Sequence, residues 1–222
     1  MKKLYGIIVA LFVMQLCLSA GLTKNDSING HEFVDLGLSV KWATCNVGAS
    51  TPEDYGDYFA WGETATKKSY WLDTYRFRTS GEWIDETTFS KYNFKSGRGN
   101  VDNKERLDFS DDVARTKWGS FWRMPTKTEW DELRDNCTWT WISNGGVKGY
   151  KVTSKKNGKS IFLPAAGGIA FSSVNNDGDA CYWSSTLYKD NPGNAYSLYF
   201  DSKEIKVNYH GRHLGLSVRS VF

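Results

Sequence analysis

The strongest helix-start signal in the chain lies in the stretch Trp122-Arg123-Met124-Pro125-Thr126-Lys127-Thr128-Glu129-Trp130. Thr126 and Glu129 form a capping box, in which the threonine hydroxyl accepts a hydrogen bond from the amide of Glu129 and the glutamate side chain accepts one from the amide of Thr126. Trp130, Leu133 and Cys137 follow at positions i, i+3 and i+7. The spacing predicts a helix whose apolar face, with these three residues, points into a core.

A weaker helix signal lies upstream. Ser110 as N-cap, with Asp111 and Asp112 in the first turn, predicts a helix that ends at Trp118. Because the two aspartates are adjacent at a helix start, their carboxylates point apart, which suits capping rather than acid–base catalysis.

Strand patterns follow downstream and fill both ends of the chain. Asn157-Gly158 separates two strand-like runs, 150–153 and 160–163, and predicts a β-hairpin. Residues 32–36 and 38–43 predict a strand pair or one bent strand, and residues 216–221 predict a last strand. Because helices lie in the middle and strands at both ends, we expect an α+β fold whose terminal strands pair.

The segment 196–210 alternates with a period of two, which predicts two strands. In the first strand, Tyr196, Leu198 and Phe200 share one face, and Ser197, Tyr199 and Asp201 share the other. In the second, the two faces consist of Ile205, Val207 and Tyr209, and of Lys206, Asn208 and His210.

Two further segments carry less regular patterns. Pro52 stands where the first residue of a helix would be and predicts a short helix toward Tyr58. Residues 63–103 are polar and aromatic without a steady period, so we expect long loops with local turns.

The composition is that of a folded domain rich in aromatic residues. The 222 residues include 10 Trp, 12 Tyr, 12 Phe and 21 Gly, and 40% are hydrophobic. These values exclude a disordered tail, a collagen-like fibre and a polytopic membrane protein. The formal net charge is +3, which is far below the positive charge typical of nucleic-acid-binding proteins. We therefore expect no nucleic acid partner.

The N-terminus has the pattern of a secretory signal peptide. Lys2 and Lys3 precede an apolar run that ends near Ala20, so residues 1–20 are predicted to be removed, with 21–31 as a linker and 32–222 as one domain. A lipoprotein that uses Cys17 is the less favoured alternative. No second hydrophobic span follows, so we expect an exported protein without a membrane span in its mature chain, located outside the cell, at its surface or in the periplasm.

Three cysteines follow the predicted signal peptide: Cys45, Cys137 and Cys181. An odd number leaves at least one unpaired, export permits a disulfide, and the sequence favours none of the three pairings. Their spacing matches no zinc motif, and we expect Cys45 and Cys137 to be apolar core residues. The stretch Asn175-Asn176-Asp177-Gly178-Asp179 lacks the spacing and the closing glutamate of an EF-hand, so an Asx-rich turn is preferred over a calcium site. We expect no metal and no cofactor.

Several blocks in order resemble one known family. They are Phe33-Val34-Asp35-Leu36-Gly37-Leu38-Ser39-Val40-Lys41-Trp42-Ala43-Thr44-Cys45-Asn46-Val47-Gly48-Ala49, Tyr55-Gly56-Asp57-Tyr58-Phe59-Ala60-Trp61-Gly62-Glu63, Trp122-Arg123-Met124-Pro125-Thr126, Phe162-Leu163-Pro164-Ala165-Ala166-Gly167, Tyr182-Trp183-Ser184-Ser185-Thr186 and Gly215-Leu216-Ser217-Val218-Arg219. The chain is thereby similar to the Fibrobacter succinogenes major paralogous domain family, common in exported proteins of Bacteroidetes. The resemblance implies a C-type-lectin-like domain with two helices, small antiparallel sheets and long loops, a fold that serves sugar binders, protein binders and one enzyme group.

The resemblance and the residue types together direct attention to the C-terminal segment. The same fold class includes the variable proteins of diversity-generating retroelements, in which randomised Asn codons never yield Lys or Glu. Most residues of this C-terminal segment fit that restriction, whereas Lys203, Glu204 and Lys206 do not. The sequence therefore leaves open whether this gene is diversified. The segment is also rich in Tyr, His, Arg and Ser, residue types that antibody paratopes use to bind their ligands. The predicted ligand-binding residues are Tyr188, Ser197, Tyr199, Asp201, Ile205, Val207, Tyr209, His210, Arg212 and His213.

Three functional hypotheses follow. The first is an exported, non-enzymatic protein that binds a glycan or a protein with this C-terminal surface, on a scaffold made rigid by Trp42, Trp61, Trp122, Trp130 and Phe162. The second is a structural or adhesion subunit, of unknown oligomeric state, with the aromatic segment 70–94 as its contact. The third is a degenerate relative of the formylglycine-generating enzymes, to which the block 123–130 is similar. Those enzymes need a pair of reactive cysteines, and Cys181 has no partner near it in sequence, so we expect no catalytic residue and no enzyme activity.

Overall fold

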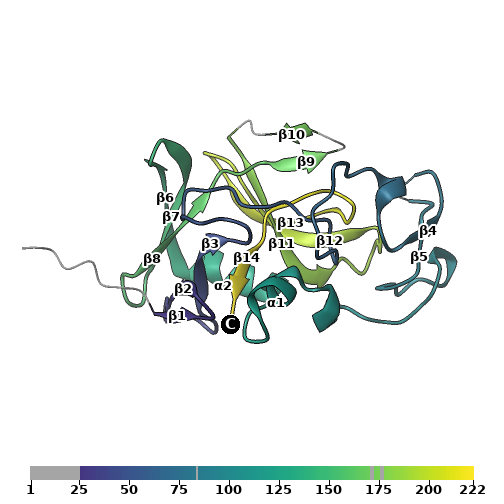
Figure 1. Cartoon of the computed structure of the whole chain (residues 1–222), viewed down its shortest axis with the longest axis horizontal. Helices are drawn as coiled ribbons and strands as arrows, with labels where there is room; N and C mark the ends of the chain where they lie inside the picture. Colours follow the sequence, from purple (N-terminus) through teal and green to yellow (C-terminus); the bar gives the residue numbers. More distant parts are fainter. Residues whose placement is uncertain (1–25, 84, 171–172, 176–177) are drawn as a thin grey trace, which may run out of the picture.

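The computed structural model describes residues 26–83, 85–170, 173–175 and 178–222. Within these ranges the protein is α+β, with two α-helices and small antiparallel sheets (Figure 1). The helices are α1 (Val113–Trp118) and α2 (Lys127–Asn136). The strands are β1 (Ser27–Ile28), β2 (His31–Val34), β3 (Trp42–Asn46), β4 (Arg78–Ser80), β5 (Thr88–Phe89), β6 (Cys137–Asn144), β7 (Val147–Ser154), β8 (Ser160–Pro164), β9 (Gly168–Ala170), β10 (Ser173–Asn175), β11 (Ala180–Leu187), β12 (Asn194–Phe200), β13 (Ile205–Gly211) and β14 (Arg219–Val221).

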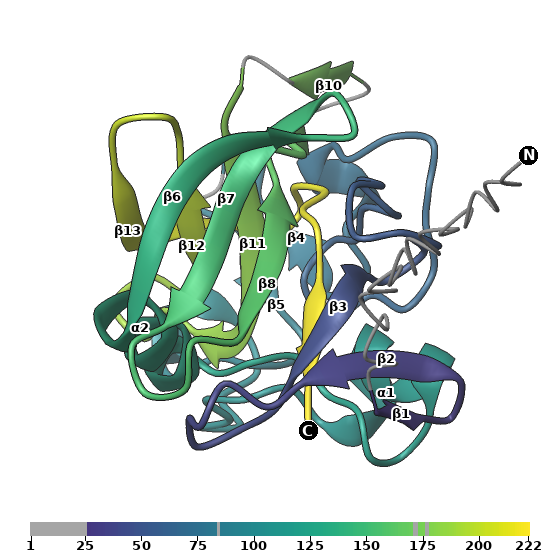
Figure 2. The same cartoon turned by 90° about the vertical axis from the view of Figure 1, so that its left-hand side faces the viewer.

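Three sheets and two hairpins make up the described β-structure. The sheets have the strand orders β1-β2-β3-β14, β6-β7-β8 and β11-β12-β13, and the hairpins are β4-β5 and β9-β10. The β6-β7-β8 sheet and the β4-β5 hairpin lie at opposite ends of the molecule (Figure 1). Seen end-on, β6, β7 and β8 cover the front, with α2 beside them and β3 and β14 next to β8 (Figure 2).

The predicted capping box is confirmed at the start of α2. The amide of Glu129 donates to Thr126 Oγ1 at 3.3 Å, and the amide of Thr126 donates to Glu129 Oε2 at 2.7 Å. Arg123 clamps the same carboxylate with hydrogen bonds of 2.8 and 2.5 Å. Trp130 lies buried on the inner face, as expected. Cys137 is buried too, but the helix ends at Asn136 and Cys137 begins β6, so its placement on the helix was wrong.

The other predicted helix begins later than expected. Ser110 lies in a 3₁₀ turn, Phe109–Asp111, and α1 starts at Val113 with Asp112 as its cap. Asp112 caps the helix in place of Ser110 because its carboxylate is held by three amides. One oxygen accepts from the amides of Ala114 and Arg115, and the other accepts from the amide of Met124 at 2.8 Å. Several amide donors to one carboxylate outweigh a single serine cap.

Both ends of the chain meet in one sheet, as predicted. β14 pairs with β3, so that Val221 faces Trp42. The predicted linker 21–31 needs correction, because its last residues form β1 and the start of β2, and β1 pairs antiparallel with β2. His31, in this segment, stacks on the Trp118 ring at 3.9 Å. Folded structure therefore starts before Glu32.

The helix predicted after Pro52 is not present. Residues 51–53 form a turn, and the Asp54 carboxylate accepts from the amides of Ser50 and Thr51. Gly56, with a φ of 72°, then takes a left-handed conformation that a helix would not tolerate. Local side-chain bonding therefore replaces the helix.

The hairpin predicted around Asn157-Gly158 is confirmed. β7 and β8 pair in the register Lys151↔Phe162, with Gly158 in the turn at a φ of 72°. The hairpin that precedes it, β6-β7, was not predicted.

The core lies on both faces of the β11-β12-β13 sheet. One cluster contains Trp61, Trp122 and Trp183, and the other contains Trp42 and Trp130. The indole N–H groups join the clusters to backbone: Trp61 Nε1 donates to Ser184 O at 2.8 Å, and Trp130 Nε1 donates to Trp183 O at 3.2 Å. The expected burial of the four tryptophans and of Phe162 is confirmed.

The aromatic segment 70–94 is mostly part of this core. Five of its rings are buried, those of Tyr70, Tyr75, Phe77, Phe89 and Tyr92, whereas Trp71 and Trp83 are exposed. Those five rings therefore lie in the interior, and Trp71 and Trp83 are the large exposed rings that the segment offers as contacts. No helix in the described part of the chain is both long and apolar enough to cross a membrane.

Candidate functional site

The predicted binding residues do not form one surface. Register pairs Tyr196 with Tyr209, and Ala195 with His210, across β12 and β13. Because neighbouring residues of a strand point to opposite faces, Tyr209 and His210 lie on different sides of the sheet. The predicted alternation is confirmed, and it divides the candidates into two groups.

On the face that carries α2, three rings form a surface that we call the tyrosine platform: Tyr188, Tyr196 and Tyr209. The rings of Tyr188 and Tyr209 stack with centroids 4.1 Å apart and planes 5° from parallel. Tyr196 meets Tyr188 edge-on at 5.4 Å. Tyr209 is 44% exposed, the largest exposure of the three. Part of the aromatic surface of the platform, mainly that of Tyr209, is therefore open to solvent.

A polar cavity of about 290 Å³ adjoins the platform, and Tyr196 belongs to both. Its other lining residues come from α2, the end of β11 and the chain before α1: Glu105, Arg106, Lys127, Thr128, Thr186, Leu187, Lys189 and Asp190. The Lys127 ammonium lies 5.4 Å from the centre of the Tyr196 ring. The cavity thus gathers hydrogen-bonding groups of both charges beside an aromatic surface.

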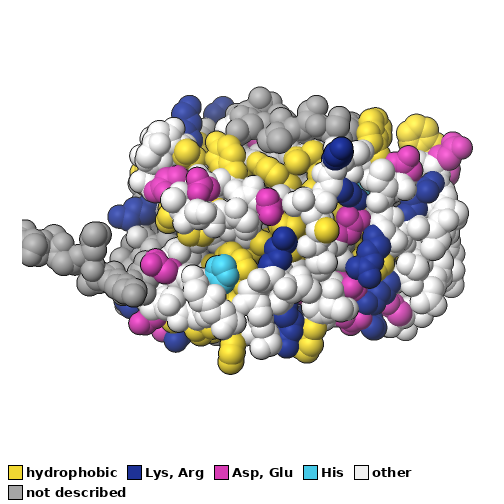
Figure 3. All heavy atoms as spheres, viewed as in Figure 1, with side chains coloured by type: hydrophobic (Ala, Val, Ile, Leu, Met, Phe, Trp, Pro, Cys, Tyr) yellow, Lys and Arg dark blue, Asp and Glu magenta, His cyan; other side chains and the backbone are white. Residues whose placement is uncertain are grey.

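The opposite face of the sheet holds an apolar cavity of about 170 Å³. Tyr199 and His210 line it, together with Cys181, Ile169 and Leu214. In the view of Figure 3, hydrophobic side chains gather in the upper part of the molecule, near β9. Two of the predicted residues are therefore together here, apart from the tyrosine platform.

A short hydrogen-bonded chain joins the buried Ser197 to two residues that line the apolar cavity, His210 and Cys181. Ser197 Oγ lies 2.7 Å from His210 Nδ1, and His210 Nε2 lies 3.7 Å from Cys181 Sγ. Burial, with Asp179 nearby, raises the pKa of the Cys181 thiol to about 12, and burial lowers the pKa of His210. Both groups are therefore neutral at pH 7, and this contact holds no thiolate nucleophile.

Four predicted binding residues lie in the core or pack against it instead. Arg212 and Ser197 are fully buried, and Ile205 and Val207 pack against the second core cluster. The two fully buried residues expose no atom to solvent, so we assign Arg212 and Ser197 to the interior of the domain.

Arg212 is held inside an aromatic cage. Its guanidinium donates to Tyr75 Oη at 2.8 Å, and to the carbonyl oxygens of Pro192, Lys91 and Tyr92 at 2.9, 3.2 and 3.3 Å. The ring centroids of Phe89 and Trp61 lie 4.7 and 4.9 Å from it. These contacts join the end of β13 to the long segment before α1.

The last two candidates lie at the edges of the sheet. Asp201 closes the β12-β13 turn, where its carboxylate accepts from the amides of Lys203 and Glu204 at 2.7 and 2.9 Å. His213 is partly buried after β13, and burial, with Lys67 nearby, lowers its pKa to about 4. Neither is part of the tyrosine platform or lines either cavity.

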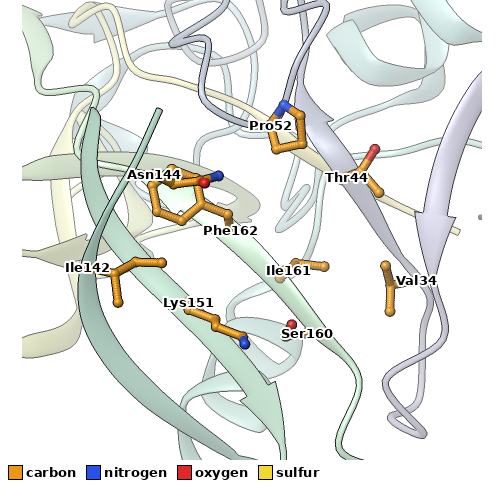
Figure 4. A pocket seen from close by; sticks show the side chains of 9 residues that line it. All are labelled: Val34, Thr44, Pro52, Ile142, Asn144, Lys151, Ser160, Ile161 and Phe162. Carbon is orange, nitrogen blue, oxygen red and sulfur yellow. The ribbon is translucent and has the colours of Figure 1, made fainter. Parts of the chain in front are cut away.

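Two larger cavities lie near β2 and β3. One, of about 380 Å³, opens between Val34 and Thr44 on one side and Ile142, Ile161 and Phe162 on the other (Figure 4). The second, of about 460 Å³, includes His31, Cys45 and Trp118. Lys151 is the one charged side chain that lines the first, and the second contains the stacked pair of His31 and Trp118, of which the Trp118 ring is buried.

Cysteines and metal ligands show no further site in the described residues. Cys45, Cys137 and Cys181 are all free thiols, and Cys137 is buried as predicted, whereas Cys45 is only partly buried. No group of three or more His, Cys, Asp or Glu side chains is arranged for a metal ion in the part of the chain that the structure describes. Asn176 and Asp177, of the stretch weighed as a calcium site, lie outside the described residues.

The sequence analysis did not identify the residues that line the polar cavity. Tyr196 could have been found, since its alternation places it on the face of Tyr209, although it was grouped with the core residues Leu198 and Phe200. Arg106 and Glu105 come from an irregular segment far from β12 in sequence, and no local pattern marks them.

The chain was also compared with known proteins. No protein-family model, no curated protein and no solved structure matches it.

Proposed function

We propose that this is an exported, non-enzymatic binding protein with a C-type-lectin-like domain, and that it recognises a saccharide on the tyrosine platform. Export rests on the signal-peptide pattern of residues 1–20, and the lectin-like domain rests on the family resemblance of the sequence blocks. The α+β arrangement with paired terminal strands agrees with that resemblance.

The observation that carries the proposal is the parallel stack of Tyr188 on Tyr209, half-open to solvent beside a polar cavity. A sugar ring has an apolar C–H face and a rim of hydroxyl groups. Its face can pack on an aromatic ring, while charged and hydroxyl side chains next to that ring accept and donate hydrogen bonds. The tyrosine platform and the polar cavity together offer both kinds of contact.

The rigidity of the site favours binding as well. Tyr209 is fixed by its stack with Tyr188 and by strand pairing with Tyr196. A side chain that is already ordered loses little conformational entropy when a ligand arrives. The tryptophan-rich clusters on both faces of the sheet hold the strands themselves in place.

A glycan array tests this proposal. Wild type, Tyr209→Ala and Tyr188→Ala are compared, with Trp83→Ala as a matched control because Trp83 is 70% exposed and outside the platform. Removal of an aromatic anchor typically costs about 2 kcal/mol or more, or roughly thirtyfold in affinity. We expect both tyrosine variants to lose binding and Trp83→Ala to retain it. Equal binding by all four proteins would refute the site.

A further inference from the structure

We infer that the saccharide bound at the tyrosine platform carries a carboxylate, and that Arg106 receives it. This inference rests on the proposed function and adds the charge of the ligand. It follows from how the ionic groups of the polar cavity are paired.

Most charges in the cavity have partners within the protein. Lys189 Nζ pairs with Glu105 at 2.9 Å, and Lys127 Nζ pairs with Asp131 at 2.6 Å. Asp190 interacts with Tyr188. Arg106 differs, since it is exposed and forms no ion pair with any described residue. The cavity therefore has one cation available for a ligand among its described residues.

The position of Arg106 is fixed although its side chain is free. Arg106 bridges Thr186 of β11, the Leu187 amide donates to Glu105 O at 2.8 Å, and the Leu107 amide donates to Ser185 O at 3.1 Å. The buried Leu107 anchors the segment. Its side chain thus extends from a backbone held in place and lines the same cavity as Tyr196.

The chemistry of guanidinium selects the ligand group. Its planar donors match the two oxygens of a carboxylate in a bidentate pair. A neutral sugar that fills the cavity removes water from Arg106 and supplies no counter-charge, whereas a carboxylate replaces that water with a charged hydrogen-bond acceptor. Arg106 therefore contributes binding free energy to an acidic sugar that it does not contribute to a neutral one.

The test uses pairs of probes in which only one member carries a carboxylate. Trigalacturonate is compared with its methyl ester, and 3′-sialyllactose with lactose, by calorimetry with the full mature chain. 3′-Sulfolactose separates a carboxylate from a sulfate. We expect tighter binding of the carboxylated member of a pair, weakened by added salt, and a loss of about tenfold to a hundredfold for Arg106→Gln.

Variants separate the failure of this inference from that of the proposed function. Arg115→Gln, on α1, is the matched control and should bind as wild type does; the thermal midpoints of both arginine variants verify folding. Binding that depends on Tyr209 but not on Arg106 or ligand charge would overturn the inference alone. A preference for 3′-sulfolactose over 3′-sialyllactose would overturn it too. If Tyr209→Ala changes nothing, or no probe binds, both proposals fail.

Discussion

Replacement of Arg212 by methionine tests the reassignment of this residue from ligand contact to core. Methionine keeps the apolar stem of arginine and removes the guanidinium. That group donates to Tyr75 Oη and to three main-chain carbonyl oxygens, and it forms no ion pair with a described carboxylate. Burial also lowers the pKa of Arg212, so the folded state bears a desolvation cost that the variant would relieve.

The magnitude follows from the balance of these two effects. A buried ion can often be replaced by apolar groups without loss, provided that its partners go with it. Here the carbonyl groups of Lys91, Tyr92 and Pro192 remain, and each buried acceptor left without a donor costs about 1–3 kcal/mol. We therefore expect Arg212→Met to lose about 3 kcal/mol or more of unfolding free energy. In a chain of this size that lowers the thermal midpoint by about 6–12 °C.

Urea unfolding followed by tryptophan fluorescence measures this loss, with Arg106→Met as the control. Arg106 is exposed, and a substitution at such a position should change the unfolding free energy by no more than about 0.5 kcal/mol. Equal stability of Arg212→Met and wild type would refute the account of the aromatic cage. A loss of ligand affinity without a loss of stability would return Arg212 to the binding surface.

Three other predictions concern stability. Burial lowers the pKa of His213 to about 4. The neutral histidine therefore stabilises the fold above pH 6.5, and this contribution is lost as the pH falls through 4. Between pH 7 and pH 4, the thermal midpoint should fall less in His213→Gln than in wild type. Thr126→Ala removes the hydroxyl that accepts from Glu129, and chemical denaturation should show a loss of about 1 kcal/mol. Gly149→Ala brings a Cβ against the carbonyl oxygen of Leu163 in the paired strand, and calorimetry should show a lower midpoint. Gly97→Ala is the control, because a Cβ there meets no atom within 4 Å and the backbone is not in the left-handed region, so its midpoint should stay near that of wild type.

Local patterns in the sequence predicted the parts of the fold that depend on neighbouring residues. The capping box of Thr126 and Glu129 and the turn at Asn157-Gly158 are each complete within a few residues, and both were found where expected. The period-two pattern of β12 and β13 correctly separated Tyr209 from His210. Asp112 displaced Ser110 as a cap partly through the amide of Met124, which lies beyond the helix and which no local pattern includes.

The candidate site was harder to predict because long-range contacts define it. Arg212 has the residue type of a ligand contact, and its cage comes from rings and carbonyl groups more than a hundred residues earlier, apart from Pro192. Arg106 reaches the cavity through pairing with Thr186, which the sequence does not indicate. Residue type alone therefore could not separate residues of the interior from residues of the surface.

NMR of the tyrosine rings, with the ring carbons labelled, tests the central claim most directly. A saccharide identified on the array is titrated into the protein, and the shifts of each assigned ring are followed. We predict that the largest shifts belong to Tyr188, Tyr196 and Tyr209, with Tyr199 on the far face of the sheet unchanged. Shifts confined to Tyr199, beside the apolar cavity, would contradict the claim that the tyrosine platform is the binding surface.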